Sequence, residues 1–248
     1  MKNAAHIICS TQKEKEQLML VYKGDNITVV HWPVNMINGL HRKKEIRLSF
    51  RERYGIAPNI RILLFLGRMH PIKRPIETIK LFLKSDVSNT VLFLAGPFEQ
   101  YTENELNAFI RKENSVADSV KILGPIYGAE KDDLLLASDC LISLSDRENF
   151  GHVAVESLSV GNPVILSPGN FLSRDLEDID CGWMLKDMTD QNIINTIKEF
   201  SKTKDSDLNV MGNNGKDWVI KNLNIDIFEK RIMDLAKKTI ESDNVNTK

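Results

Sequence analysis

The sequence predicts an α/β fold with a doubly wound, mostly parallel sheet. Short apolar runs alternate with stretches of helical periodicity from residue 61 to about residue 185, which is typical of consecutive βαβ units. The runs at 62–66, 91–95 and 140–144 are apolar at nearly every position, so we expect helices to cover both faces of the sheet. With 248 residues, the chain is long enough for one large domain or two small ones.

The order of predicted elements follows from these patterns. Strands are expected at 4–9, 26–30, 62–66, 91–95, 120–123, 140–144, 164–166 and 182–185, and helices at 11–22, 45–54, 75–83, 104–113, 131–137 and 152–160. The last third is predicted to form a helical C-terminal segment over 191–200, 208–221 and 225–240. The alternation places the sheet in the middle of the chain.

Composition excludes several classes of protein. The formal net charge of −1 provides no overall field that would attract nucleic acid. Three widely spaced cysteines show neither a disulfide framework nor a metal pattern, and no apolar run reaches the length of a membrane span. We therefore expect a cytoplasmic protein. The basic run at 41–44 has two interpretations, a solvated face or a patch for lipid head groups that would hold the protein at a membrane surface.

Four loops are candidates for a ligand site. In parallel α/β sheets, ligands bind beyond the carboxyl ends of the strands, and here those ends are followed by loops 67–74, 96–100, 124–128 and 146–151. Three of these loops begin with glycine, which permits a positive φ and a close approach of the backbone to a ligand. The loop 67–74 also brings three cations, Arg68, Lys73 and Arg74, whose shapes and charges suit phosphate oxygens. A solvated basic loop is an equally good interpretation of this segment alone.

Two glutamates bracket the last of these loops. Glu148 and Glu156 are separated by seven residues, and a helix is predicted to begin at Gly151 between them. The start of a helix offers free N–H groups and a positive dipole end, which suit a phosphate or sugar hydroxyls. Glu156 can reach back toward this point, and a carboxylate can accept hydrogen bonds from a ribose diol. The alternative is a solvated pair, but the helix is so apolar that a glutamate in it is expected to need a partner.

Together, these motifs resemble the retaining glycosyltransferases of family 4, which have the GT-B fold. The resemblance is carried, in order, by Gly67-Arg68, Lys73-Arg74, Glu148-Asn149-Phe150-Gly151 with Glu156, and Gly161-Asn162-Pro163-Val164. Two glutamates at this separation are the signature of the family. The resemblance extends from about residue 26 to the end of the chain and corresponds to the C-terminal, donor-binding half of the family's two-domain enzyme.

The resemblance implies a role for each site residue. Arg68 and Lys73, next to Gly67, would bind the donor diphosphate and stabilise its charge as it leaves. Glu148 would lie beside the donor sugar, with the backbone of Asn149, Phe150 and Gly151 around it, and Glu156 would bind the ribose. The loop with Gly124, Ile126 and Tyr127 would lie beside the base. Arg68, Lys73 and Glu148 are thus the predicted catalytic residues, and neither a metal nor a cofactor is implied, since the nucleotide-diphosphate sugar is the donor substrate.

The resemblance also divides the chain and suggests its partners. Residues 1–25 resemble the last strand and helix of the family's N-terminal domain, 26–222 its Rossmann-like donor domain, and 223–248 the helix that packs back toward the N-terminal domain. The implied function is retaining hexosyl transfer to a glycan or lipid-linked acceptor in polysaccharide or glycoconjugate biosynthesis. Because the acceptor domain has no counterpart here, we expect an acceptor-domain protein or self-association. The alternative is a non-catalytic nucleotide-sugar-binding or scaffolding module.

Two further patterns have simpler explanations. Asp178-Ile179-Asp180 and Asp205-Ser206-Asp207 fit the aspartate pair that holds manganese in the other large glycosyltransferase fold, but they are expected to be a solvated loop and a helix cap. The three tryptophans, Trp32, Trp183 and Trp218, are expected to be packing residues.

Overall fold

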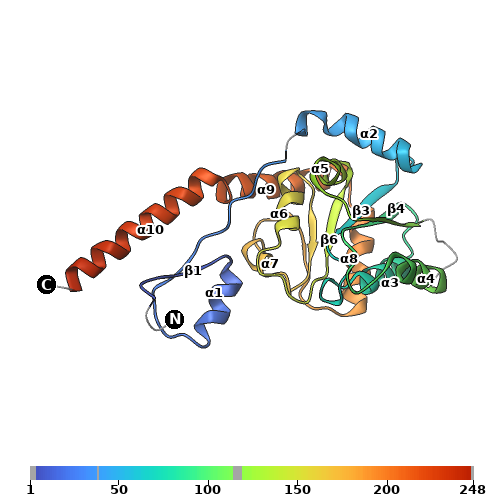
Figure 1. Ribbon diagram of the computed structural model, residues 1–248. Coiled ribbons are helices and arrows are strands. Elements are labelled where there is room, and N and C mark those ends of the chain that lie inside the picture. The colour runs from blue at the N-terminus through green and yellow to red at the C-terminus, as the bar shows by residue number, and fades with distance from the viewer. Residues whose placement is uncertain (1–3, 38, 114–118, 247–248) are drawn as a thin grey trace.

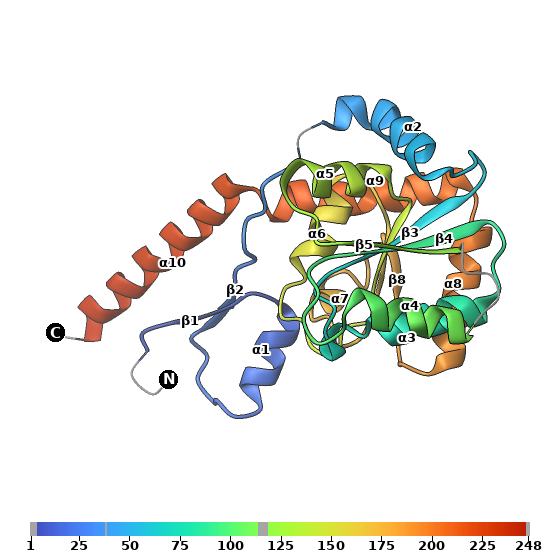
Figure 2. The ribbon, with the colours of Figure 1, turned by 45° about the vertical axis from the view of Figure 1, so that its right-hand side comes forward.

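The computed structural model describes residues 4–37, 39–113 and 119–246. The ends of the first and last predicted divisions, 1–3 and 247–248, lie outside these ranges. The central sheet has six parallel strands in the order β5-β4-β3-β6-β7-β8 (Figures 1 and 2). They are β3 (Arg61–Leu66), β4 (Thr90–Ala95), β5 (Val120–Gly124), β6 (Cys140–Ser143), β7 (Val164–Leu166) and β8 (Gly182–Met184). The predicted doubly wound sheet is confirmed.

Helices cover both faces of this sheet. One layer contains α2 (Lys43–Tyr54), α5 (Gly128–Ala137), α6 (His152–Ser159) and α9 (Asp205–Asn222), and the other α3 (Pro75–Ser85), α4 (Glu103–Glu113) and α8 (Asp190–Lys202) (Figures 1 and 2). Along β3, Ile62 and Leu64 belong to the core under the first layer, whereas Leu63 and Phe65 belong to the core under the second. Both faces of the strand are buried, which explains its continuously apolar sequence.

Short helical elements mark the main departures from the predicted boundaries. Two 3-10 helices, η1 (Leu40–Arg42) and η2 (Pro71–Lys73), lie in segments expected to be loops, and α7 (Leu172–Asp175) lies in a segment expected to be a turn. Each is three or four residues long, which is too short to leave a periodic signal in the sequence.

A small N-terminal unit precedes the sheet. The strands β1 (Ile7–Cys9) and β2 (Ile27–Val29) form a separate parallel pair, joined by α1 (Gln12–Met19). The pair crosses the predicted division at residue 25, since β2 follows it. At the other end of the chain, α10 (Ile225–Asn246) leaves the sheet domain and extends toward this unit (Figures 1 and 2).

The basic run at 41–44 does not form one continuous surface. Lys43 turns inward and donates to the backbone oxygen of Val160 at 2.7 Å, while Arg42 pairs with Glu45 three residues further along the chain. Lys43 thus departs from both interpretations, whereas the exposed pair of Arg42 with Glu45 fits a solvated face. Within the part of the chain that is described, no helix combines the length and the apolar character needed to cross a membrane. The three cysteines are free and buried.

Candidate functional site

The strand order places two of the predicted loops side by side. Successive strands run outward from β3 through β4 to β5, and the chain then returns to place β6 on the other side of β3. The loops that follow β3 and β6 therefore start next to each other at the carboxyl edge and then lead to opposite sides of the sheet. Open parallel sheets bind ligands at such a point. These are the loops that carry the predicted cations and Glu148.

Glycines let three of the loops touch each other. The N–H of Gly67 donates to Ala95 O at 2.9 Å, and the N–H of Gly96 donates to Gly124 O at 2.8 Å. Gly96 has a φ of +134°, and a Cβ there would lie 2.6 Å from the carbonyl carbon of Gly67. Gly124 also has a positive φ, +71°, whereas Gly67 does not. The predicted need for a positive φ thus holds for two of the three glycines, and a close backbone approach explains Gly96.

The loop 67–74, which we call the cationic loop, contacts the loop 146–151, which we call the acid loop. Lys73, at the end of η2, pairs with the carboxylate of Glu148, and Arg74 Nη1 lies 3.2 Å from Asp146 Oδ1. The backbone makes the same connection, because Asp146 N donates to Ile72 O at 2.9 Å. Lys73 and Glu148, separated by 75 positions in the sequence, are therefore brought together at the edge of the sheet.

Arg68 lies at the same edge but has a different partner. Its Nη1 is 2.9 Å from Glu99 Oε2, on the loop that follows β4, and about half of its side chain is exposed. An exposed ion pair of this kind contributes little to stability, so Arg68 can exchange Glu99 for a more highly charged partner at small cost. The ring of His70 accepts a hydrogen bond from Ile72 N at 3.1 Å and so has a structural role in η2.

The acid loop is held by the segment after β7. Glu148 N donates to Gly169 O at 2.9 Å and Phe171 N donates to Glu148 O at 2.8 Å. Gly151 has a φ of +73°, and a Cβ on it would lie 2.8 Å from the side-chain oxygen of the buried Asn170. These contacts within the protein fix the backbone of the loop. Asn149 lies in this loop, and Phe150 is buried beneath it at 4% exposure.

Helix α6 places the second glutamate. Glu156 Oε1 lies 2.7 Å from Lys131 Nζ on α5, and neither side chain is more than 29% exposed. The partner that burial requires of Glu156 is therefore Lys131. The far end of α6 is anchored as well, because Lys43 donates to Val160 O. The helix is fixed at both ends, at the acid loop and at the opposite edge of the domain.

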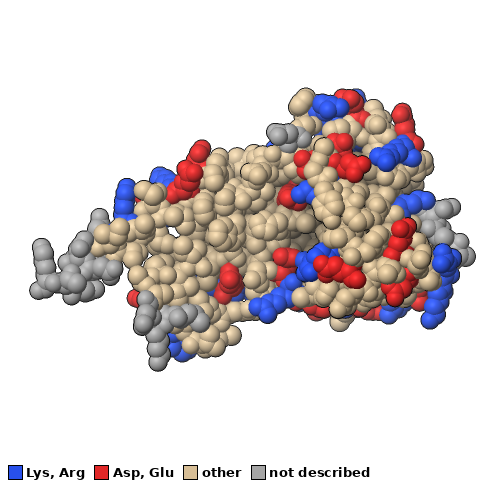
Figure 3. Space-filling model, viewed as in Figure 1, with Lys and Arg blue, Asp and Glu red and all other residues tan. Residues whose placement is uncertain are grey.

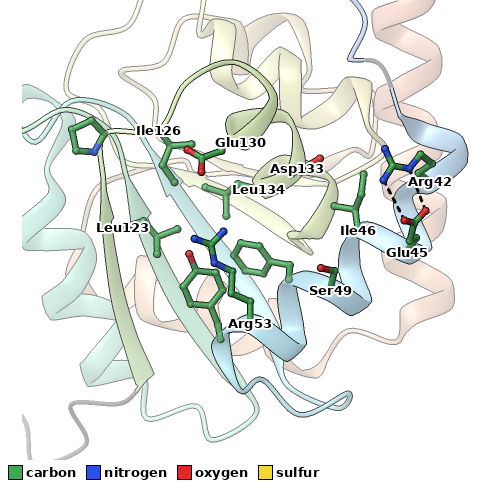
Figure 4. A pocket seen from close by; sticks show the side chains of 13 residues that line it. Arg42, Glu45, Ile46, Ser49, Arg53, Leu123, Ile126, Glu130, Asp133 and Leu134 are labelled. Carbon is green, nitrogen blue, oxygen red and sulfur yellow. Dashed lines mark hydrogen bonds and ion pairs between the residues drawn. The ribbon is translucent and has the colours of Figure 1, made fainter.

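The loop 124–127 separates this site from a cavity on the other side. That cavity has a volume of about 280 Å³ and lies between α2 and the start of α5 (Figure 4). The side chain of Ile126 points into it, together with Leu123 and Leu134, and Arg53 lies at its rim. The side chain of Ile126 is therefore turned toward α2, and the neighbouring Tyr127 is 66% exposed.

Sequence reasoning missed two residues of this arrangement, Lys131 and Asn170. The segment 167–171 also follows the carboxyl end of a strand, so the rule that selected the other four loops would have found Asn170. Lys131 gives no comparable signal, because its contact with Glu156 depends on how α5 and α6 are rotated.

The two aspartate pairs have different surroundings in the structure. No group of three His, Cys, Asp or Glu side chains suited to a metal occurs among the described residues. Asp178 and Asp180 lie in a loop, as expected. The expectation that Asp205 caps a helix was wrong: the N-cap of α9 is Lys204, and Asp205 lies one position inside, 3.0 Å from Arg61 Nη2. Its contact with Arg61 explains its position.

Comparison with known proteins identifies the family. Residues 47–218 match the family described as glycosyl transferases group 1. The chain belongs to this family. The predicted resemblance to the family 4 glycosyltransferases is confirmed, and the order of the six strands agrees with the predicted GT-B domain.

Relatives with curated descriptions are longer than this chain. A D-inositol 3-phosphate glycosyltransferase of Actinosynnema mirum is 30% identical over 171 residues, which are 65% of this chain and 40% of that protein. Another, from Streptomyces scabiei, is 24% identical over 215 residues, covering 83% of this chain and 48% of that protein. The chain thus spans less than half of the length of these relatives.

Solved structures share the fold over nearly the whole chain. Anabaena Alr3699/HepE in complex with UDP and glucose has a TM-score of 0.78 at 18% identity, covering 95% of this chain and 64% of that one. Sucrose-phosphate synthase from Thermosynechococcus elongatus has a TM-score of 0.78 at 20% identity, covering 97% of this chain and 59% of that one. These likenesses extend across the N-terminal unit as well as the sheet domain.

Proposed function

We propose that this chain binds a nucleotide-diphosphate sugar at the carboxyl edge of its sheet and forms the donor-binding part of a retaining hexosyltransferase. The observation that carries the proposal is the meeting of Lys73 and Glu148 across the point where the strand order reverses. The bond that breaks in a sugar nucleotide joins a phosphate to a sugar. Lys73 suits the phosphate side of this bond, and Glu148 suits the hydroxyls of the sugar side. Solved structures of the same fold contain UDP and glucose.

The two cations of the proposed site are paired with carboxylates. A bound diphosphate carries more charge than Glu99 or Glu148 and would become the partner of Arg68 and Lys73. Glu148 would then be free to accept hydrogen bonds from the hydroxyls of the sugar, with the backbone of Asn149, Phe150 and Gly151 around the ring. The ion pairs thus hold the side chains close to their proposed working positions.

The nucleoside would lie along α6 and the loop 124–127. Glu156, oriented by Lys131, is placed to accept hydrogen bonds from the ribose hydroxyls. The backbone of Gly124, Ile126 and Tyr127 would border the base, since the side chain of Ile126 is turned toward α2.

The chemistry then follows from charge stabilisation. The bond between the anomeric carbon and the diphosphate oxygen breaks, and its electron pair goes to the diphosphate, where Arg68 and Lys73 stabilise the developing charge. The acceptor hydroxyl bonds to the same carbon from the same face, and its proton passes to the departing phosphate oxygen. Glu148 orients the sugar and does not act as a nucleophile.

Much of the acceptor would be bound by a further domain. A two-stranded parallel sheet does not form a stable unit alone, and the β1–β2 unit leaves Ile8, Leu20 and Val21 exposed at 46%, 76% and 77%. We propose that residues 1–25 and the helix 223–248 pack against an acceptor-binding domain, in the same polypeptide, in a partner protein or in a second copy. The acceptor would be a glycan or a lipid-linked sugar.

Calorimetry of nucleotide binding tests the proposal. We expect the chain to bind UDP or GDP more tightly than UMP or GMP, because Arg68 and Lys73 contact the second phosphate. Lys73→Ala should weaken diphosphate binding by about tenfold or more, since it removes a charge-assisted hydrogen bond. Lys84→Ala is the matched control, because Lys84 forms an exposed pair with Asp190 on the far helix layer.

The outcomes separate the alternatives. Equal affinity for mono- and diphosphates, or no diphosphate binding, would contradict the proposed site. Diphosphate binding without sugar transfer in the presence of an acceptor domain would favour the non-catalytic binding module.

A further inference from the structure

A separate cavity lies on the other side of the acid loop, where the N-terminal unit, α6 and α10 meet. It has a volume of about 470 Å³, and we name it the junction cavity. Its lining residues include Trp32 from the segment after β2, Phe228 from α10, and Glu148 and Asn149 from the acid loop. It therefore begins where the proposed donor sugar ends, at Glu148.

One wall of the junction cavity is aromatic. Trp32 packs against Phe228 with ring centroids 5.8 Å apart and an interplanar angle of 31°. The sequence suggests a packing role for Trp32, yet half of its surface is exposed. An indole ring that is supported on one side and open on the other offers a flat apolar surface with a polar edge. On the face drawn in Figure 3, the surface between α10 and the sheet domain carries few charged side chains.

The remaining lining is mixed: it has apolar side chains from Ile8, Val30, Phe150 and Ile232 and several polar residues, with no lysine or arginine among the described residues. Ser10, Glu14, Asn149 and His152 supply hydrogen-bonding groups around the aromatic wall, and Glu14 already accepts from Ser10 N at 2.6 Å. Two of the lining residues are glutamates. Lys73, which pairs with Glu148, is not one of the lining residues. The charge of this cavity is thus opposite to that of the proposed diphosphate site.

We propose that the junction cavity binds the part of the acceptor next to the transferred sugar, and that this part is an uncharged sugar ring lying on Trp32. The inference rests on the proposed function, because it takes Glu148 as the neighbour of the donor sugar. A flat apolar face together with several hydroxyl-binding groups suits a pyranose ring, which has apolar C–H faces and a hydroxylated edge.

A phosphorylated acceptor group does not suit this cavity. Phosphate is repelled by the two carboxylates, and the described lining offers it neither lysine nor arginine. The curated relatives above are named for an inositol 3-phosphate substrate. The charge of the junction cavity argues against assigning that substrate to this chain.

The proposal is tested by probe binding to the full chain with the donor site saturated by UDP. The probes are the methyl glycosides of glucose, galactose and mannose, glucose 6-phosphate as the charged counterpart, and decanoate as the acyl probe. Binding is followed by saturation-transfer NMR and calorimetry. If UDP itself does not bind, the proposed function fails, and this result is distinct from every outcome below.

We expect at least one methyl glycoside to bind, and glucose 6-phosphate to bind at least tenfold more weakly. Trp32→Ala should weaken glycoside binding by about tenfold, and Trp32→Tyr by much less, because it keeps an aromatic face. UDP affinity should be unchanged in both variants. Trp183→Phe is the control, since Trp183 lies on β8 and packs against Phe200 instead. Thermal unfolding verifies that each variant is folded.

Three results would overturn the proposal. They are the failure of every methyl glycoside to bind at tens of millimolar, glycoside binding that Trp32→Ala leaves unchanged, and a phosphorylated or acyl probe that binds more tightly than the glycosides and depends on Trp32. The first or second would remove the aromatic wall from acceptor recognition. The third would replace the neutral sugar with another chemical class.

Discussion

Replacing Gly96 with alanine tests whether the loops at the proposed phosphate site must touch. The new Cβ would lie 2.6 Å from the carbonyl carbon of Gly67 and closer still to its oxygen, whereas ordinary contacts are 3.4–4 Å. The obstacle is backbone, so no side-chain rotation can relieve it. Gly96 also has a φ of +134°, which side chains rarely adopt. The variant must therefore displace Gly67, and with it the neighbouring Arg68.

A second glycine separates the two causes of instability. Gly55 has a φ of +65°, and apart from its two chain neighbours no described residue has an atom within 4 Å of the place that a Cβ would take there. Gly55→Ala therefore carries conformational strain alone, about 1 kcal/mol. Gly96→Ala adds steric overlap, which costs about 1–3 kcal/mol in packed regions. We therefore expect Gly96→Ala to lower the free energy of unfolding by about 2–4 kcal/mol, the sum of the strain and the overlap.

Urea unfolding measures the stability difference, and calorimetry with UDP measures the effect on the site. Gly96→Ala should weaken UDP binding as well as stability, whereas Gly55→Ala should leave UDP affinity unchanged. Equal losses of stability in the two variants would refute the steric argument. Unaltered UDP affinity in a destabilised Gly96→Ala variant would show that the position of Gly67 does not control the site.

Three further predictions follow from single contacts. Lys131→Met should weaken UDP binding by about tenfold through the loss of the cation that orients Glu156; calorimetry that shows wild-type affinity would remove Lys131 from the site. Burial and the nearby Arg47 lower the pKa of Lys43 to about 8, so above this pH the unfolded chain holds a proton that the folded chain has lost. The free energy of unfolding, compared with that of Lys43→Met, should thus rise from about pH 8 to pH 10 in urea titrations, and a pH-independent difference would contradict this. Ser157→Ala should be neutral or slightly stabilising in the same assay, because the buried hydroxyl of Ser157 has no hydrogen-bond partner among the described residues; a loss above about 1 kcal/mol would indicate a missed partner.

Much of the fold was predictable because its signals are local. Strands buried on both faces leave continuous apolar runs, such as 62–66 and 91–95, and the carboxyl ends of parallel strands must share one edge. The same geometry predicted that loops 67–74 and 146–151 would lie at one edge of the sheet, but it did not predict which side chains would pair there.

What the sequence could not supply depends on how elements are rotated and packed. The direction of the Ile126 side chain, into the α2 cavity, follows from the path of the loop. The partner of Glu156 depends on the relative rotation of α5 and α6. Trp32 packs against Phe228 as expected, but the exposure of half of its surface depends on where α10 lies. None of these features has a period or a spacing that the chain itself could show.

Because α6 is anchored at both ends, the distance between Glu148 and Glu156 is nearly fixed. Glu156 lies one helical turn beyond His152, where α6 begins, which corresponds to about 6 Å along the helix axis. Neither the acid loop nor the Lys43 end allows the helix to slide. A donor whose sugar lies at Glu148 and whose ribose lies at Glu156 must bridge a nearly constant gap. We therefore expect the number of phosphates between sugar and ribose to be selected by length, with one phosphate too short to reach both glutamates.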